Sequence, residues 1–274
     1  MAEINLAEKY STKVAERFAL ASITDAFAGK DYDFSGVKSI KIYSINTVAM
    51  GDYTRSGTER FGTMEELGDT VQEMTMSKDR SFTFSIDKGN KVQQFNIKAA
   101  TKALKRQIDE VVTPEIDKYR LEKWAAGAGL TLAQTGLTKG NIVENIMTGG
   151  MNMSNNLVPR TKRTLFIKES LYLHTKLADQ VVGLESLGTK AVKDGSVGTL
   201  DGMKVVPVPD SYFPSGVNYM IKYKGATVDP MQLKTYRVLT EQRGIDGDVV
   251  EGRIIYDAFV LDTRAKGIFV STDS

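Results

Sequence analysis

The sequence contains no cysteine and a single histidine, His174. A chain without cysteine forms no disulfide and offers no thiolate as nucleophile or metal ligand. His174 lies in a short mixed segment without a second ligand at the spacing that metal sites use. The two shortages exclude a zinc site and a cysteine–histidine catalytic pair. The missing cysteines also fit a reducing compartment.

Long apolar runs and a strong charge excess are missing as well. No stretch approaches the ~20 apolar residues that span a bilayer, and the first residues lack the apolar core of a signal peptide. The net charge is only +2, whereas a surface dominated by nucleic-acid attraction needs a strong basic excess. We therefore expect a soluble protein that is made inside the cell and has no membrane partner.

What is present indicates an ordered globular protein. The chain has 274 residues, of which 41% are hydrophobic and 26% charged. These values are ordinary for folded domains. The length allows one large domain or two ordinary ones, and either could bury a sizeable core.

The longest helical pattern runs from Gln93 to Ala128. Apolar side chains recur there three or four residues apart. About 30 helical residues make a rod of roughly 45 Å, so other parts of the chain must lie along it. Pro114 lacks a backbone donor, which predicts a kink there or two helices meeting at Thr113. Basic residues decorate the first half of the rod at helical spacing, either as a solvated face or as a contact surface: Lys98, Lys102, Lys105 and Arg106.

Residues 5–28 read as one or two amphipathic helices. Their apolar stripe has a spacing of four residues and consists of Leu6, Tyr10, Val14 and Phe18. A helix this short is marginal alone, so the stripe must dock. Its own domain and a neighbouring subunit are both possible surfaces. Glycine and aspartate between Gly29 and Gly36 mark the first break.

Two strands and a long connection follow. Residues 37–50 are rich in β-branched side chains, and in 80–87 Phe82, Phe84 and Ile86 alternate with polar residues. We expect these two strands to pair. The connection 51–79 is far longer than a hairpin turn, which predicts a protruding two-stranded arm or, alternatively, a mobile surface loop.

The connection carries apolar residues and acidic residues that it cannot bury by itself. The apolar residues include Tyr53, Phe61, Met64 and Leu67, and an acidic tip is formed by Glu65, Glu66, Asp69 and Glu73. Isolated hairpins are barely stable, so the arm needs a surface to lie on.

Residues 129–229 read as a compact α/β unit. A helix capped by Thr138 or Asn141 should end near Gly149–Gly150. A strand at 163–168, a helix at 169–177 and a glycine-rich loop at 183–202 come next. The strand 203–209 contains Pro207 and Pro209, which place it at an edge or end of its sheet.

The remaining residues read as long strands. Segments 232–244 and 249–271 are joined at 244–248, where Asp246–Gly247 is a strong turn signal. The run from Gly183 to Lys190 is not a phosphate loop, because the motif needs lysine before threonine and the order is reversed. Asp246, Asp248 and Glu251 lack calcium-loop spacing. No catalytic, cofactor-binding or metal-binding constellation emerges, which favours an assembly protein over an enzyme.

Four stretches carry a family resemblance: RSFTFSIDKGN, VVTPEIDKYRLEKWA, GTLDGMKVVPVPDSYFP and VEGRIIYDAFVLDTRAKGIFVS. They resemble coat proteins of phages that infect Gram-positive bacteria. The order of parts, over nearly the whole chain, resembles major capsid proteins of tailed double-stranded DNA phages with the Hong Kong 97-type fold. The resemblance implies an α+β fold in five parts: an N-terminal arm (1–36), an extended loop (37–89), the spine helix of a peripheral domain (90–128), an axial domain (129–229) and returning peripheral strands (230–274).

The resemblance also implies a function. Copies of the chain would form hexamers and pentamers of an icosahedral virion shell around packaged double-stranded DNA, assembled in the host cytoplasm without a cofactor. Portal and decoration proteins would be partners. Fewer than 40 residues precede the extended loop, too few for a fused scaffold, so a separate scaffolding protein is expected.

The acidic tip would then lie near basic groups of a neighbour, and the stripe Lys98, Lys102, Lys105 and Arg106 is one candidate surface. Two other functions stay open. An encapsulin-like nanocompartment uses the same fold around a cargo protein, and a metabolic α/β enzyme could use residues 51–79 as a lid.

Overall fold

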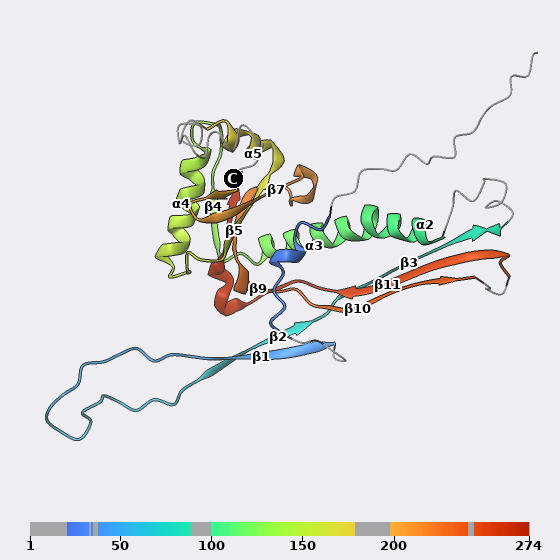
Figure 1. Cartoon of the computed structure of the whole chain (residues 1–274). Coiled ribbons are helices and arrows are strands. Elements are labelled where there is room, and N and C mark those ends of the chain that lie inside the picture. Colours follow the sequence, from blue (N-terminus) through green and yellow to red (C-terminus); the bar gives the residue numbers. More distant parts are fainter. Residues whose placement is uncertain are drawn as a thin grey trace, which may run out of the picture.

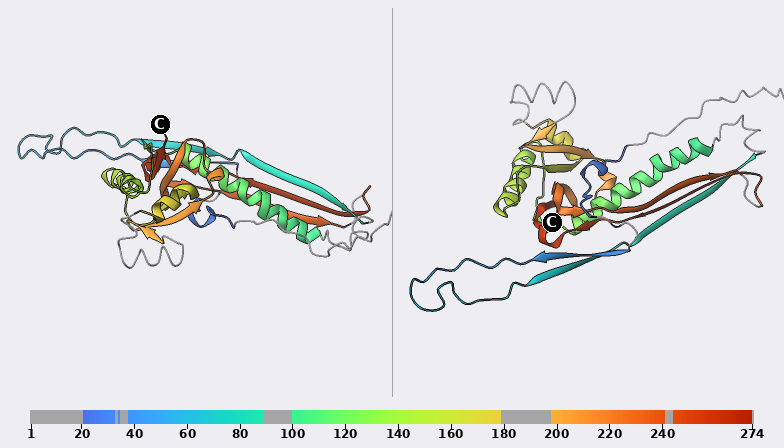
Figure 2. Two further views of the ribbon diagram at one scale, coloured as in Figure 1. Left: turned by 90° about the horizontal axis from the view of Figure 1, so that it is seen from above. Right: turned by 60° about the horizontal axis from the view of Figure 1, so that its bottom comes forward.

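The computed structural model describes residues 21–32, 34, 38–88, 100–178, 198–240 and 244–273. The predicted stripe of Leu6, Tyr10, Val14 and Phe18 lies outside these residues, as does Lys98. Most of the glycine-rich loop does so too. The body has an elongated half and a rounded half, and a long arm leaves the body at their junction (Figures 1 and 2).

The rod consists of α2 (Ala100–Gln107), a π-helical turn (Ile108–Val112) and α3 (Thr113–Ala126). Val112 and Thr113 keep right-handed helical dihedral angles, and the Thr113 N–H donates to the Ile108 carbonyl. The predicted interruption at Pro114 is therefore a change of hydrogen-bonding register rather than a loop between two helices. A π turn is a known way to absorb an irregularity without breaking a helix.

A three-stranded antiparallel sheet lies along the rod (Figure 1). Its order is β10 (Met231–Leu239), β11 (Gly247–Tyr256) and β3 (Lys78–Asp87). Ile86 and Val250 pack with Ala100 of α2. β10 and β11 form an antiparallel pair, but Gly247 and Asp248 already belong to β11, so the predicted turn residues 246–247 stand at the start of the strand rather than in the middle of the connection.

The predicted pairing of residues 37–50 with 80–87 is wrong. β1 (Ser39–Ile45) pairs with β2 (Asp69–Thr75), and β3 pairs with β11 instead. β2 has the sequence DTVQEMT, and only its Met74 is buried, so it lacks the alternation that announces a strand. Only Met76 and Ser77 separate β2 from β3, so the chain runs from the arm almost directly into the three-stranded sheet.

The rounded half is built on a six-stranded sheet whose order is β4-β13-β8-β5-β7-β6. Its strands are β4 (Leu130–Ala133), β13 (Ile268–Thr272), β8 (Val217–Tyr223), β5 (Arg163–Lys168), β7 (Met203–Val208) and β6 (Thr199–Leu200). β13 comes from the end of the chain and lies between β4 and β8. On one side of β7, Pro207 lies opposite Ile167 of β5. On the other side, β6 pairs only with Met203 and Lys204, so Pro207 has no neighbour there among the described strands. This fits the prediction that the prolines lie at an edge or end of the sheet.

Helices cover both faces of this sheet. α4 (Ile142–Asn155) and α5 (Glu169–Lys176) pack on one face, where Ile146 meets Tyr219 and Phe269. α3 packs on the other face through Leu121 and Trp124. Short β9 (Thr227–Val228) and β12 (Phe259–Val260) pair between the two halves of the body. Short 3-10 turns occupy Asp25–Phe27, Asp210–Tyr212, Lys224–Ala226 and Asp262–Gly267.

α4 does not end near Gly149–Gly150 but continues to Asn155. Gly149 faces the sheet, and a Cβ at this position would lie 2.7 Å from the buried Phe269 ring. The glycine is needed because the helix approaches the sheet closely there. At Gly150 the nearest atom would be a carboxylate oxygen of exposed Asp201, at 3.3 Å.

We predict that Gly149→Ala lowers the free energy of unfolding by about 1–2 kcal/mol. Overpacking costs roughly 1–3 kcal/mol, and better helix propensity recovers up to about 1 kcal/mol. Gly150→Ala is the matched control and should be neutral or slightly stabilising. Urea denaturation of both variants measures the difference; equal midpoints would contradict a packing role for Gly149.

Candidate assembly surfaces

The arm exposes large apolar side chains that the described residues of its own chain leave uncovered. Every residue from 45 to 71 is exposed. Phe61 and Met64 retain 91% and 97% of their accessible surface. The full set of exposed apolar side chains on the arm is Tyr43, Ile45, Val48, Met50, Tyr53, Phe61, Met64, Leu67 and Val71. An exposed apolar surface of this kind marks an interaction site.

The base of the arm is fixed to the body. Met74 and Met76 are buried with Phe34 and Leu261. Gln72 donates to the Val260 carbonyl at 2.9 Å and accepts from the Asp262 N–H at 3.0 Å. The arm therefore leaves the body in a defined direction.

The far end of the arm is a preformed turn. The Thr54 N–H donates to the Arg60 carbonyl at 3.0 Å, and Gly57 and Gly62 adopt the positive φ angles of 94° and 85°. The Tyr53 and Phe61 rings meet edge to face at 5.0 Å. This pair presents an aromatic surface at the turn.

The predicted acidic tip is not at the turn. Glu65, Glu66, Asp69 and Glu73 follow it on the returning limb of the arm. Glu73 lies opposite Lys41 on β1, with 3.9 Å between the charged atoms. Glu65 and Glu66 are exposed and have no ion-pair partner among the described residues.

The described part of the predicted basic stripe, Lys102, Lys105 and Arg106, lies on α2, far from the arm of the same chain (Figures 1 and 2). Lys102 and Lys105 are exposed, while Arg106 pairs with Glu110 at 3.0 Å. The structure does not bring the acidic limb and this stripe together within one chain. Contact between them would have to join two copies.

A further exposed apolar set lies on the rounded half and was missed by sequence reasoning. Met147 and Met151 are four residues apart on α4, and Leu173 and Leu177 are four residues apart on and just after α5. The spacing was readable in the sequence. The sequence did not show which side of each helix is exposed, because both helices also carry buried apolar residues.

Buried charged side chains hold segment 22–29 against the body. Asp117 of α3 accepts hydrogen bonds from the Ser22 and Thr24 hydroxyls and from the Ile23 N–H. Asp229 accepts from the Gly29 N–H at 2.8 Å. These carboxylates accept hydrogen bonds from backbone N–H groups that would otherwise be buried without an acceptor.

Lys222 is the buried cation of this network. Its Nζ donates to the Phe27 carbonyl at 2.6 Å and lies 3.9 Å from the centroid of the Trp124 ring. Burial lowers the pKa of Lys222 to about 8, although the charge of Asp229 opposes this shift. Arg120 and Lys224 lower the pKa further through their like charges.

We predict that stability rises with pH between about 8 and 10. The folded pKa of Lys222 is about 8 and its unfolded value is 10.5, so the unfolded chain binds more protons in this window. The gain is at most about 1.4 kcal/mol per pH unit. Above pH 10 tyrosines reverse the trend, because burial raises the pKa of Tyr119 from 10.0 to about 12.

Urea midpoints of wild type, Lys222→Met and the exposed control Lys139→Met at pH 7–10 measure this effect. Lys222→Met should flatten the rise, and Lys139→Met should keep it. A rise of the same slope in Lys222→Met would assign it to another group.

Within the described ranges, no cluster of three or more histidine, cysteine or acidic side chains is placed to hold a metal ion. None of the described helices is long and apolar enough to cross a membrane. His174 is half-buried on α5.

Comparison with solved structures finds the same fold in phages. A structure from Mycobacterium phage Che8 aligns with a TM-score of 0.83 at 15% identity, covering 98% of this chain and 97% of that one. The capsid structure of cyanophage P-SCSP1u aligns with a TM-score of 0.81 at 12% identity, covering 97% and 92%. The mature capsid of bacteriophage PhiM1 gives a TM-score of 0.75 at 11% identity, covering 97% and 91%.

The chain therefore shares the fold of these phage structures over 97–98% of its length, and the predicted α+β capsid fold is confirmed. No protein-family model matches the sequence, and no curated protein matches it. The similarity to these phage proteins is therefore structural, and sequence identities of 11–15% support a shared fold and nothing more.

Proposed function

We propose that this chain is the major capsid protein of a tailed phage. The observation that carries the proposal is the arm, which exposes nine large apolar side chains beyond the reach of its own body. The fold shared with phage capsid structures over nearly the full length supports it. The role is structural rather than catalytic.

Each copy would be completed by its neighbours. The arm would lie over the adjacent subunit, and covering one large apolar side chain contributes about 1.5–3 kcal/mol. The exposed residues of α4 and α5 would meet their copies around the five- and six-fold axes, as an axial domain does. Many such contacts add through multivalency, which favours hexamers, pentamers and a closed icosahedral shell.

Charged residues would set the register of these contacts. The acidic limb would lie near basic groups of the neighbour, with the stripe of Lys98, Lys102, Lys105 and Arg106 as one candidate surface. Exposed ion pairs contribute only about 0–1 kcal/mol each. They would therefore determine the register between subunits more than the strength of their association. The remaining candidate contacts, Leu6, Tyr10, Val14 and Phe18, would add an N-terminal interface.

The shell would enclose double-stranded DNA without sequence-specific contacts, which suits a net charge of +2. Its partners would be copies of itself, a separate scaffolding protein, a portal and decoration proteins. The protein would reside in the virion after assembly in the host cytoplasm. An encapsulin-like nanocompartment is not favoured, because the compared structures named above come from phages. Nucleic acid rather than cargo protein in purified particles would separate the two.

We predict that Phe61→Ser with Met64→Ser raises the concentration needed for particle assembly by at least roughly tenfold. Each substitution removes an apolar side chain that a neighbour would cover. Leu157→Ser, equally exposed at 91% but outside the arm, is the control and should assemble normally. Sedimentation and negative-stain microscopy measure assembly, and unchanged particles in the arm variant would contradict the role of the arm.

We also predict that Glu65→Lys with Glu66→Lys slows assembly and reverses its dependence on salt. Opposite charges attract less at high ionic strength and like charges repel less, so wild type should assemble more slowly in salt and the variant faster. Light scattering at several salt concentrations follows both. The electrostatic contribution is refuted if rate and salt dependence match wild type.

A further inference from the structure

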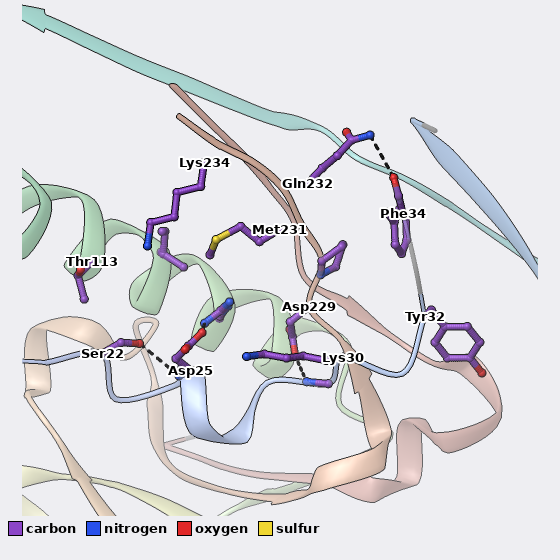
Figure 3. A pocket seen from close by; sticks show the side chains of 14 residues that line it. Ser22, Asp25, Lys30, Tyr32, Phe34, Thr113, Asp229, Met231, Gln232 and Lys234 are labelled. Atoms are coloured by element: carbon purple, nitrogen blue, oxygen red, sulfur yellow. Dashed lines mark hydrogen bonds and ion pairs between the residues drawn. The ribbon is translucent and has the colours of Figure 1, made fainter. Parts of the chain in front are cut away.

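A cavity of about 480 Å³ opens between segment 22–34, α3 and the start of β10 (Figure 3). Its lining combines three cations with apolar side chains. The cations are Arg120, Lys30 and Lys234, and the apolar side chains include Phe34, Ile116 and Met231. A pocket of this composition suits an acidic group carried on an apolar segment.

Arg120 has unused hydrogen-bonding capacity. Its side chain is 2% exposed, and its Nη1 donates to Thr24 Oγ1 at 3.1 Å and to Asp25 Oδ1 at 3.3 Å. Its Nε has no acceptor among the described residues. This donor is itself buried, so Arg120 contributes positive charge behind the wall of the pocket, and the accessible donors for an anion are those of the two lysines.

The acidic group in the floor of the pocket is already engaged. Asp229 accepts from the Gly29 N–H and Thr227 Oγ1, both at 2.8 Å, and from Trp124 Nε1 at 2.7 Å. Asp25 is paired with Arg120. Both carboxylates of the pocket are therefore engaged, and so is Arg120, which leaves Lys30 and Lys234 as the cations without an ion-pair partner among the described residues.

Two exposed lysines from different elements line the pocket. Lys30 precedes Phe34 on the N-terminal segment and Lys234 belongs to β10, and Figure 3 shows both at the pocket. Both are exposed, and neither has an ion-pair partner in the part of the chain that the structure describes. Together they attract an incoming anion.

We propose that this pocket receives the carboxylate of Glu65 or Glu66 from the arm of a second copy. The proposal rests on the proposed function, because it needs copies that pack with their arms over one another. The arm offers the matching chemistry in Met64-Glu65-Glu66-Leu67, two acids between two exposed apolar side chains. Met64 and Leu67 would cover Met231, which is 38% exposed at the pocket.

The arm of the same chain cannot supply this group. Figures 1 and 2 show the arm projecting away from the body in every view. Half of the loop 46–68, about a dozen residues, reaches roughly 40 Å when extended. That reach is enough to cross onto an adjacent molecule.

Engineered disulfides test the contact directly, because the chain has no cysteine of its own. Leu67→Cys and Met231→Cys place thiols beside the acids and beside the pocket while all the charges remain. Under mild oxidation, assembled particles of this double variant should give a ladder of linked chains on a non-reducing gel. Leu67→Cys with Thr101→Cys is the matched control, with its second thiol beside Lys102 on α2, and it should give no ladder.

Charge exchange provides the second measurement. Lys30→Glu with Lys234→Glu should slow assembly by roughly tenfold, and adding Glu65→Lys and Glu66→Lys should restore it. Lys102→Glu with Lys105→Glu should not be rescued in this way.

The outcomes separate the two proposals. Particles that form without the 67–231 ladder, or that are linked through position 101, overturn the pocket and leave the proposed function intact. A wild-type chain that stays monomeric under all assembly conditions overturns both.

Discussion

The arm carries more apolar surface than the described part of the chain covers, and much of the structure follows from that constraint. A two-stranded ribbon has one neighbour for each strand and no core, so it is barely stable alone. Here its base is fixed by buried Met74 and by the paired hydrogen bonds of Gln72. Beyond the base, the apolar side chains stay exposed. No other part of the chain that the structure describes buries them, which is the basis for proposing that a second molecule does.

A projecting arm needs a rigid support, and the elongated half of the body provides one. The rod of α2 and α3 lies along a three-stranded sheet that continues from the arm through β3. Asp257 holds the junction, because its carboxylate accepts from the Ser77 N–H at 2.7 Å and from the Tyr119 hydroxyl at 2.7 Å. The direction of the arm is thus coupled to the rod by buried hydrogen bonds rather than by a flexible link.

Sequence patterns predicted the parts whose side chains repeat regularly. The alternation of Phe82, Phe84 and Ile86 with polar residues predicted a strand. The recurrence of apolar residues at three- and four-residue intervals predicted the rod. The partner of β1 could not be predicted, because β2 is a strand of the arm with one buried residue and no alternation to read. Gly149 was misread as a helix end, since glycine in a sequence does not distinguish a stop from a close contact with a distant Phe269. The apolar and acidic side chains of the arm were readable from the sequence, whereas the pocket was not: Arg120, Lys30 and Lys234 are far apart in sequence and line one cavity only in the fold.

In the proposed assembly, apolar contacts would supply affinity and charged contacts would supply specificity, a combination that suits reversible association. Apolar contacts are non-directional, so a shell held by them alone would tolerate misplaced arms. In the proposed contact, a carboxylate that enters the pocket between Lys30 and Lys234 is directional, because few placements let it pair with both lysines. Wrong placements leave both charges desolvated and unpaired, which is costly. In the proposed shell, affinity would come from Phe61 and Met64 while the acidic site would select the register, and subunits that bind wrongly would dissociate before the shell closes.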